Sequence, residues 1–176
     1  MRIFDVAAAL LAVSLVSPAF AQTPLVPAPV EQHAMMLHSD DPVLAANKKL
    51  VYDMYRTVLQ AGQWSRAREF IAEGYIQHNP NVVSGRAALE EYIRNSRPAV
   101  EVEDTIKLPL ISIIAERDRV ALNFVKPEKD EDGNTYYTTW YDMFRIENGK
   151  IIEHWDPALK TPAMLTFNPN STRMKQ

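Results

Sequence analysis

The chain has 176 residues and a formal net charge of −3 at pH 7, with 19 Lys and Arg against 22 Asp and Glu. Because no basic stripe runs along it, this balance argues against a nucleic-acid-binding protein. The lack of cysteine excludes disulfides and thiolate chemistry, so the fold depends on its core alone. The length suits a single domain.

The first 21 residues have the pattern of a secretory signal peptide. Arg2 precedes an apolar run at 6–16, and residues 19–21 form the small-x-small pattern Ala-Phe-Ala before Gln22. The run is too short for a permanent membrane anchor. We therefore expect cleavage near Ala21 and export to the periplasm or the medium, with no membrane association of the mature chain. A buried N-terminal helix is the alternative.

Residues 22–41 are expected to form an extended arm, because they contain three prolines and few large apolar side chains. His33 and His38 lie in this arm. We expect both to be solvated and assign them no role.

A first helix is predicted from Asp41 to Gly62. Asp41 is a favourable N-cap, Pro42 suits the first helical position, and apolar residues recur at helical spacing up to the glycine. Shorter elements follow in chain order: a helix at 64–73, an extended piece at 75–78, a turn at 79–81 and a third helix at 85–95 capped by Ser84.

After Pro98 the pattern changes to strands, which are predicted at 106–115, 119–125, 136–146 and 150–156, with a tail at 157–176. Three helices followed by antiparallel strands indicate an α+β domain at 42–156, with the helices on one face of a curved sheet. Where the helices cannot fill the concave face, a pocket remains.

The last hairpin can form in two registers. A two-residue Asn148-Gly149 turn pairs Glu147 with Lys150, whereas a three-residue loop with Gly149 in the left-handed conformation pairs Ile146 with Lys150. The two registers send the side chains of the returning strand to opposite faces. We favour the three-residue loop.

The favoured register gathers polar groups among apolar ones. Asp142 then lies opposite His154, and Asp156 lies opposite Trp140, on a face shared with Phe144 and Ile152. Burial raises the pKa of a carboxyl group and a neighbouring imidazolium lowers it, so such a cluster can supply an acid and a base. The alternative is a solvated polar stripe. Under the two-residue turn, Asp142 would face Trp155 instead.

Three segments resemble the SnoaL-like branch of the nuclear-transport-factor-2-like superfamily: Tyr-Ile-Gln-His-Asn-Pro at 75–80, Ser-Gly-Arg at 84–86, and the hairpin at 141–156. The resemblance implies a cone-shaped curved sheet on three N-terminal helices, with a central pocket. SnoaL-like cyclases close polyketide rings by an intramolecular aldol step without a cofactor. The resemblance makes Asp142, His154 and Asp156 the candidates for acid–base chemistry.

Comparison with the related ketosteroid isomerases adds further candidates. Tyr55 and Asp142 match their enolate-stabilising pair, but Asn79 stands where these enzymes have an aspartate base. An asparagine cannot act as a base, so His78 is the substitute candidate, or else it caps the turn. Tyr55 can equally be a core residue. We expect Trp140, Phe144 and Asn79 to contact the substrate.

The sequence therefore predicts an acid–base cyclase, isomerase or lyase that needs no cofactor and acts on a small hydrophobic carbonyl compound. The alternative is an exported, non-catalytic module of the same fold that binds a small ligand or forms a homodimer. A face with Tyr141, Met143 and Trp155 would mediate the pairing. A metal site at the same His and Asp residues is the remaining rival, but no local ligand spacing supports it, so we predict none.

Overall fold

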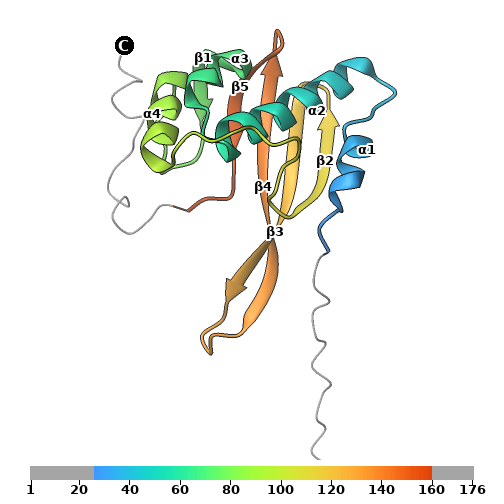
Figure 1. Cartoon of the computed structure of the whole chain (residues 1–176), viewed down its shortest axis with the longest axis vertical. Coiled ribbons are helices and arrows are strands. Elements are labelled where there is room, and N and C mark those ends of the chain that lie inside the picture. The colour runs from blue at the N-terminus through green and yellow to red at the C-terminus, as the bar shows by residue number, and fades with distance from the viewer. Residues whose placement is uncertain (1–25, 160–176) are drawn as a thin grey trace, which may run out of the picture.

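The computed structural model describes residues 26–159. The predicted signal peptide and most of the predicted tail lie outside this range. Helices lie over one face of a five-stranded sheet whose strand order is β1-β5-β4-β3-β2 (Figure 1). The strands are β1 (Ile71–Gln77), β2 (Leu110–Glu116), β3 (Arg119–Lys129), β4 (Thr135–Glu147) and β5 (Lys150–Trp155). The architecture confirms the predicted α+β class.

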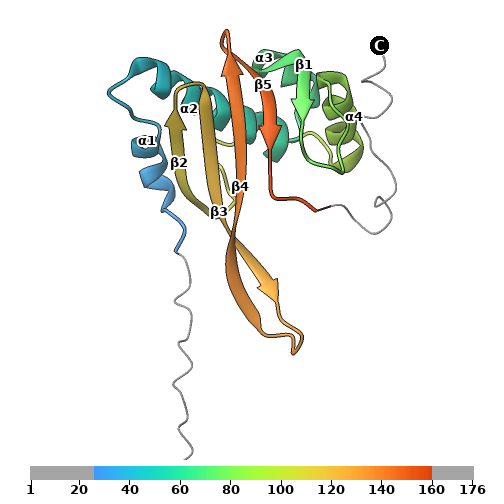
Figure 2. The same cartoon turned by 180° about the vertical axis from the view of Figure 1, so that it is seen from behind.

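Neighbouring strands from β2 to β5 pair antiparallel, whereas the edge strand β1 runs parallel to β5. Seen from the other side, the outer face of the sheet is not covered by helices, and the ends of β3 and β4 project beyond the body as a long ribbon (Figure 2). Within the described range, no helix is long and apolar enough to cross a membrane.

The helix α2 (Pro42–Met54) begins as predicted. The Asp41 carboxylate accepts hydrogen bonds from the backbone N–H groups of Val43 and Leu44, at 2.8 and 3.4 Å. Beyond Met54 the chain continues as a π-helical turn over Tyr55–Gln60, which the sequence did not predict. Such turns are rare and often occur at functional sites. This one carries Tyr55 toward the concave face of the sheet.

The predicted extended arm is partly wrong. Residues Val30–Gln32 form a 3₁₀ turn that leads into the short helix α1 (His33–Met36). His33 is only 3% exposed, and its Nδ1 lies 2.8 Å from the Tyr52 hydroxyl. Met36 and Leu37 pack against the core, so the arm is part of the fold. His38 is exposed, as expected.

The second predicted helix is shorter than expected. It consists of a 3₁₀ turn at Trp64–Arg66 and α3 (Ala67–Phe70), and Ile71 already has extended geometry. Ile71 is buried against Ile151 of β5, which draws the following residues into the sheet. The third helix, α4 (Arg86–Ser96), starts at Gly85 with a φ of 102° and has no side-chain cap. The Ser84 hydroxyl instead accepts from the N–H of Gln77.

The turn of the last hairpin is the two-residue one, so the favoured register is wrong at the turn. Asn148 and Gly149 have φ of 51° and 68°, the pattern of a type I′ turn, and Glu147 pairs with Lys150. The register then shifts by one residue, because Ile146 pairs with Ile151 and the preceding residue of β4 pairs with Glu153. This bulge leaves Ile152 as the extra residue.

The bulge returns the second half of β5 to the predicted face. His154 lies opposite Phe144, and Met143 lies opposite Trp155 on the outer face. Ile151, predicted to face outward, is fully buried in place of Ile152. The side chains therefore return to the predicted face, but the predicted pairing is wrong, because Phe144 and not Asp142 lies opposite His154. Asp142 and His154 still meet on this face as diagonal neighbours, with Oδ1 and Nε2 3.1 Å apart. Association through the outer face stays a prediction.

Candidate active site

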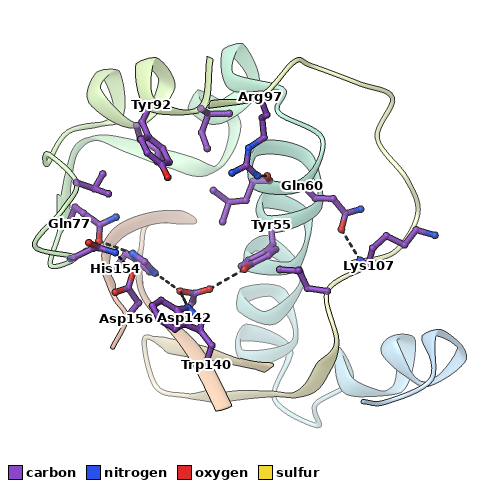
Figure 3. A pocket seen from close by; sticks show the side chains of 16 residues that line it. Tyr55, Gln60, Gln77, Tyr92, Arg97, Lys107, Trp140, Asp142, His154 and Asp156 are labelled. Atoms are coloured by element: carbon purple, nitrogen blue, oxygen red, sulfur yellow. Dashed lines mark hydrogen bonds and ion pairs between the residues drawn. The ribbon is translucent and has the colours of Figure 1, made fainter. Parts of the chain in front are cut away.

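A cavity of about 590 Å³ lies between the concave face of the sheet and the helices (Figure 3). Its polar wall comes from β1, β4, β5 and the segment after β5, and its apolar wall comes from α4 and the π-helical turn. Tyr55, Asn79, Trp140, Asp142, His154 and Asp156 all line it. This volume is in the range typical of small-molecule sites.

Asp142 is the central group of the polar wall, and its side chain is hydrogen-bonded from three directions. The Tyr55 hydroxyl donates to Oδ2 at 3.1 Å, and the Trp140 indole N–H donates to Oδ1 at 3.1 Å. The third partner is Nε2 of His154, also 3.1 Å from Oδ1. Asp142 is 6% exposed. A carboxylate at this depth requires such partners.

Gln77 orients His154. The backbone N–H of Asn79 donates to Oε1 of Gln77 at 3.0 Å, which fixes the orientation of the amide, since only the oxygen can accept. The same oxygen lies 2.8 Å from Nδ1 of His154. Nδ1 must therefore carry a hydrogen and donate it. The Gln77 amide in turn donates from Nε2 to the Tyr75 hydroxyl at 3.2 Å.

This arrangement leaves one proton for the contact between His154 and Asp142. With Nδ1 donating to Gln77, Nε2 either bears a second proton as part of an imidazolium or accepts a proton from the carboxyl group. A hydrogen bond between Nε2 and Oδ1 therefore requires one proton that the two groups share. The pair can release that proton to an acceptor in the cavity, and the Tyr55 and Trp140 donors then stabilise the charge on the carboxylate.

Asp156 has a different environment. Its Oδ2 accepts from the side-chain amide of Asn79 at 2.7 Å, and its Oδ1 accepts from the backbone N–H of Ala158 at 2.9 Å. The side chain is half-buried at the cavity wall. One hydrogen bond to each oxygen leaves lone pairs on both. Asp156 is thus positioned by Asn79, while retaining capacity to accept a proton.

Tyr55, the first residue of the π-helical turn, packs against Phe124 of β3, with the two ring centroids 5.2 Å apart. Burial, reinforced by the negative charge and the hydrogen bond of Asp142, raises the pKa of Tyr55 far above its ordinary value. Burial likewise raises the pKa of Tyr75, behind Gln77. Both phenols are therefore neutral hydrogen-bonding groups at physiological pH.

The same groups could supply ligands to a divalent metal. One ligand atom from each of Asp142, His154 and Asp156 lies within 4.8 Å of the others, and the Gln77 contact leaves Nε2 of His154 as the ligand atom. However, the hydrogen bonds from Tyr55 and Trp140 already occupy lone pairs of Asp142 that a metal would need. The donor set thus fits acid–base chemistry better than metal ligation.

Two predicted site residues lie elsewhere. His78 is exposed on the outer face, stacked on Trp155 at 4.7 Å and 3.2 Å from the carboxylate of Glu153. Side chains alternate along β1, so the residue next to inward-facing Gln77 points outward. Phe144 is buried behind His154, with the rings 4.6 Å apart, and does not line the cavity. It supports the imidazole instead of contacting a ligand.

Sequence reasoning missed Gln77 and Arg97, which both line the cavity. Gln77 stands in the Tyr-Ile-Gln-His-Asn-Pro segment, and the period-two alternation of a strand that includes Tyr75 and Gln77 could have indicated it. Tyr92 of α4 also lines the cavity and is half exposed.

Comparisons with known proteins place the chain in a family. The SnoaL-like domain family model matches residues 51–154, which is more than half of the chain. A search of curated proteins gave no match. Similar solved structures include TsrD from Streptomyces laurentii, with 20% identity over 67% of this chain and 90% of that chain at a TM-score of 0.45.

A candidate polyketide cyclase from Acidithiobacillus ferrooxidans has 13% identity over 68% of this chain and 89% of that chain, at a TM-score of 0.46. A nuclear-transport-factor-2-like protein of unknown function from Burkholderia pseudomallei has 12% identity over 68% of this chain and 95% of that chain, also at 0.46. Since the family model spans more than half of the chain, from the last turn of α2 into β5, the chain belongs to the SnoaL-like domain family.

Proposed function

We propose that the protein is an acid–base enzyme that removes a proton next to the carbonyl group of a small molecule, as a cyclase, isomerase or lyase does. The supporting observation is the pair formed by His154 and Asp142, which holds one transferable proton beside a second carboxylate, Asp156, with free lone pairs. An acid and a base on one wall of a cavity are the groups that enolisation requires.

In the proposed step, Asp156 accepts the proton from the α-carbon, and the electrons of the broken C–H bond form the carbon–carbon double bond of an enol. The carbonyl oxygen takes the proton shared by His154 and Asp142. Tyr55 and Trp140 stabilise the carboxylate that remains. The enol can then be reprotonated at another carbon, attack a second carbonyl group, or expel a leaving group, which are isomerase, cyclase and lyase outcomes respectively.

Proton exchange in D₂O tests this proposal without knowledge of the natural substrate. A panel of aromatic and alicyclic ketones, β-diketones and β-keto esters is incubated with the protein, and incorporated deuterium is measured by mass spectrometry. We expect catalysed exchange at the α-carbon of some members. In Asp156→Asn and His154→Ala the rate should fall by about 10²–10⁴-fold, the usual contribution of a general acid or base. Asp142→Asn should also lose exchange.

The matched control is His78→Ala, which removes an imidazole from the outer face of the sheet and should leave the exchange rate unchanged. If Asp156→Asn, His154→Ala and Asp142→Asn all exchange protons at the wild-type rate, the assignment is wrong. If the protein binds panel members but accelerates the exchange of none, that result favours the alternative, a module that only binds a small ligand.

A further inference from the structure

Arg97 lies on the wall of the cavity formed by α4 and the π-helical turn, away from the two carboxylates. Its side chain points from the end of α4 into the cavity (Figure 3). The cavity therefore has an acidic wall with Asp142 and Asp156, and a cation on the facing side.

The guanidinium of Arg97 has no carboxylate partner within the part of the chain that the structure describes. Its Nη1 donates to the backbone carbonyl of Leu59, and its Nε lies 3.4 Å from the Ser96 hydroxyl. Lys107, the other Lys or Arg that lines the cavity, forms an ion pair with Glu103 at 3.3 Å. Arg97 thus retains donors and a full positive charge for a ligand.

The backbone that carries Arg97 is held in place. Its N–H caps α4 by donating to Ile93 at 3.2 Å, and the N–H of Val100 donates to the carbonyl of Ala61 at 2.8 Å. Gly62 allows the backbone of Arg97 and Pro98 to pass close to its own, because a Cβ at Gly62 would lie 2.7 Å from the Pro98 oxygen and 3.0 Å from Arg97 Cγ. The cation is therefore preorganised, which lowers the entropy lost when a ligand binds.

The cavity between the two walls is mainly apolar, with Leu59, Leu89, Ile93 and Leu108 among its lining residues. A molecule that spans it needs an apolar body, a carbonyl group near His154 and a group that suits Arg97. A guanidinium matches the geometry of carboxylates, sulfates and phosphates through paired hydrogen bonds. The Asp156 carboxylate repels an anion, whereas Arg97 attracts one, so the charged group would bind at the Arg97 end.

We infer that the substrate is an apolar carbonyl compound with an oxyanion group, most simply a carboxylate, and that Arg97 binds that group while the carbonyl faces His154. This inference rests on the proposed function for the identity of the reacting group. It adds the charge and the orientation of the substrate, neither of which the acid–base cluster alone determines.

Two fluorescent probes with the same aromatic frame test the inference: 8-anilinonaphthalene-1-sulfonate, which is anionic, and N-phenyl-1-naphthylamine, which is neutral. Dissociation constants are measured by fluorescence titration. In Arg97→Gln the affinity for the sulfonate should fall about tenfold or more, because hydrogen bonds between charged groups contribute about 1.5–3 kcal/mol. The affinity for the neutral probe should stay within about twofold, since it lacks the anion that Arg97 binds.

Arg94→Gln is the matched control, because Arg94 lies in the last turn of α4, three residues before Arg97, stacks on Trp64 outside the cavity and has the same charge. It should leave both affinities unchanged, and Arg97→Lys should recover part of the sulfonate affinity. The inference is overturned if Arg97→Gln binds both probes as the wild type does, or if Arg94→Gln weakens sulfonate binding equally.

The wild-type protein gives a second measurement that does not depend on the folding of a variant. Displacement of the neutral probe by 4-acetylbenzoate should be stronger than by 4-acetylbenzamide, which has the same size and no charge. Equal displacement would contradict the inference. Proton exchange on neutral ketones does not require Arg97, so the exchange can persist even if the protein shows no selectivity for anions. The proposed acid–base function and the inference about Arg97 can therefore fail separately.

Discussion

The geometry makes a specific prediction about the protonation of His154. Because the N–H of Asn79 fixes Gln77 Oε1 as an acceptor, Nδ1 of His154 must bear a hydrogen. In Gln77→Leu that acceptor is lost, and both the imidazole and the Asn79 N–H lose their partner. A buried donor without a partner costs about 1–3 kcal/mol, so the free energy of unfolding should fall by about 2–6 kcal/mol. Urea unfolding measures this loss.

Nitrogen-15 NMR of histidine-labelled protein measures the protonation itself. In the wild type, Nδ1 of His154 should show a directly bonded hydrogen, and in Gln77→Leu this signal should be lost or exchange rapidly with water. Gln77→Glu is the matched control, because its carboxylate can accept from the same two donors and should preserve the protonated Nδ1.

His33 provides an internal reference in the same spectrum. The Tyr52 hydroxyl accepts from the N–H of Ile106 at 3.1 Å, and its own hydrogen is available to donate to Nδ1 of His33, 2.8 Å away. His33 should therefore have an unprotonated Nδ1, the opposite of His154. A wild-type His154 without a hydrogen on Nδ1 would refute the hydrogen-bond argument on which the shared proton depends.

Three further predictions concern stability. Burial and Asp142 raise the pKa of Tyr55 above its ordinary value of 10.0, so the unfolded state loses this proton first as the pH rises. The contribution of Tyr55 to the free energy of unfolding is therefore complete below about pH 10. Above that pH it declines by up to about 1.4 kcal/mol per pH unit. Urea unfolding at pH 9–11 should show a shallower decline for Tyr55→Phe. Gly62→Ala should lower the free energy of unfolding by about 1–3 kcal/mol more than Gly149→Ala, because both glycines have positive φ but only Gly62 has close neighbours. Equal losses would show that the contact with Pro98 is unimportant. His33→Ala should cost about 1–3 kcal/mol, because the hydrogen of the buried Tyr52 hydroxyl would lose its acceptor. Replacement of the exposed His38 by Ala should cost less than about 0.5 kcal/mol. Thermal unfolding distinguishes the two variants, and similar losses would mean that the arm is not anchored.

Local signals in the sequence predicted the parts of the fold that depend on neighbouring residues. The Asp41 cap was predicted correctly because capping depends on the side chain and the next two or three N–H groups. Helix α3 ended early because Ile71 is required in the sheet, and burial against a strand 80 residues later in the chain is not visible in local periodicity. The helical arm was missed for the same reason, since His33 is buried by Tyr52 of another helix.

The hairpin shows a different limit. The Asn-Gly pair is a strong signal for a two-residue turn, and that turn is what forms. The sequence did not reveal the bulge at Ile152. The bulge forms because Ile151 is buried in the core while Glu153 pairs with Arg145 on the outer face. Asp142 and His154 therefore meet on one face for a reason that only the packing of both faces could supply.

The two aspartates of the cavity show how one residue type can take two roles. Asp142 has three hydrogen-bonding partners, so it can act only through the proton it shares with His154. Asp156 accepts one bond at each oxygen and keeps lone pairs available at the cavity wall. Because Asp156 must remain able to accept a proton, a different group has to donate one. The imidazole of His154, oriented by Gln77, is that donor. The partners of each carboxylate thus separate the acid from the base, which the sequence pattern of Asp, His and Asp could not do.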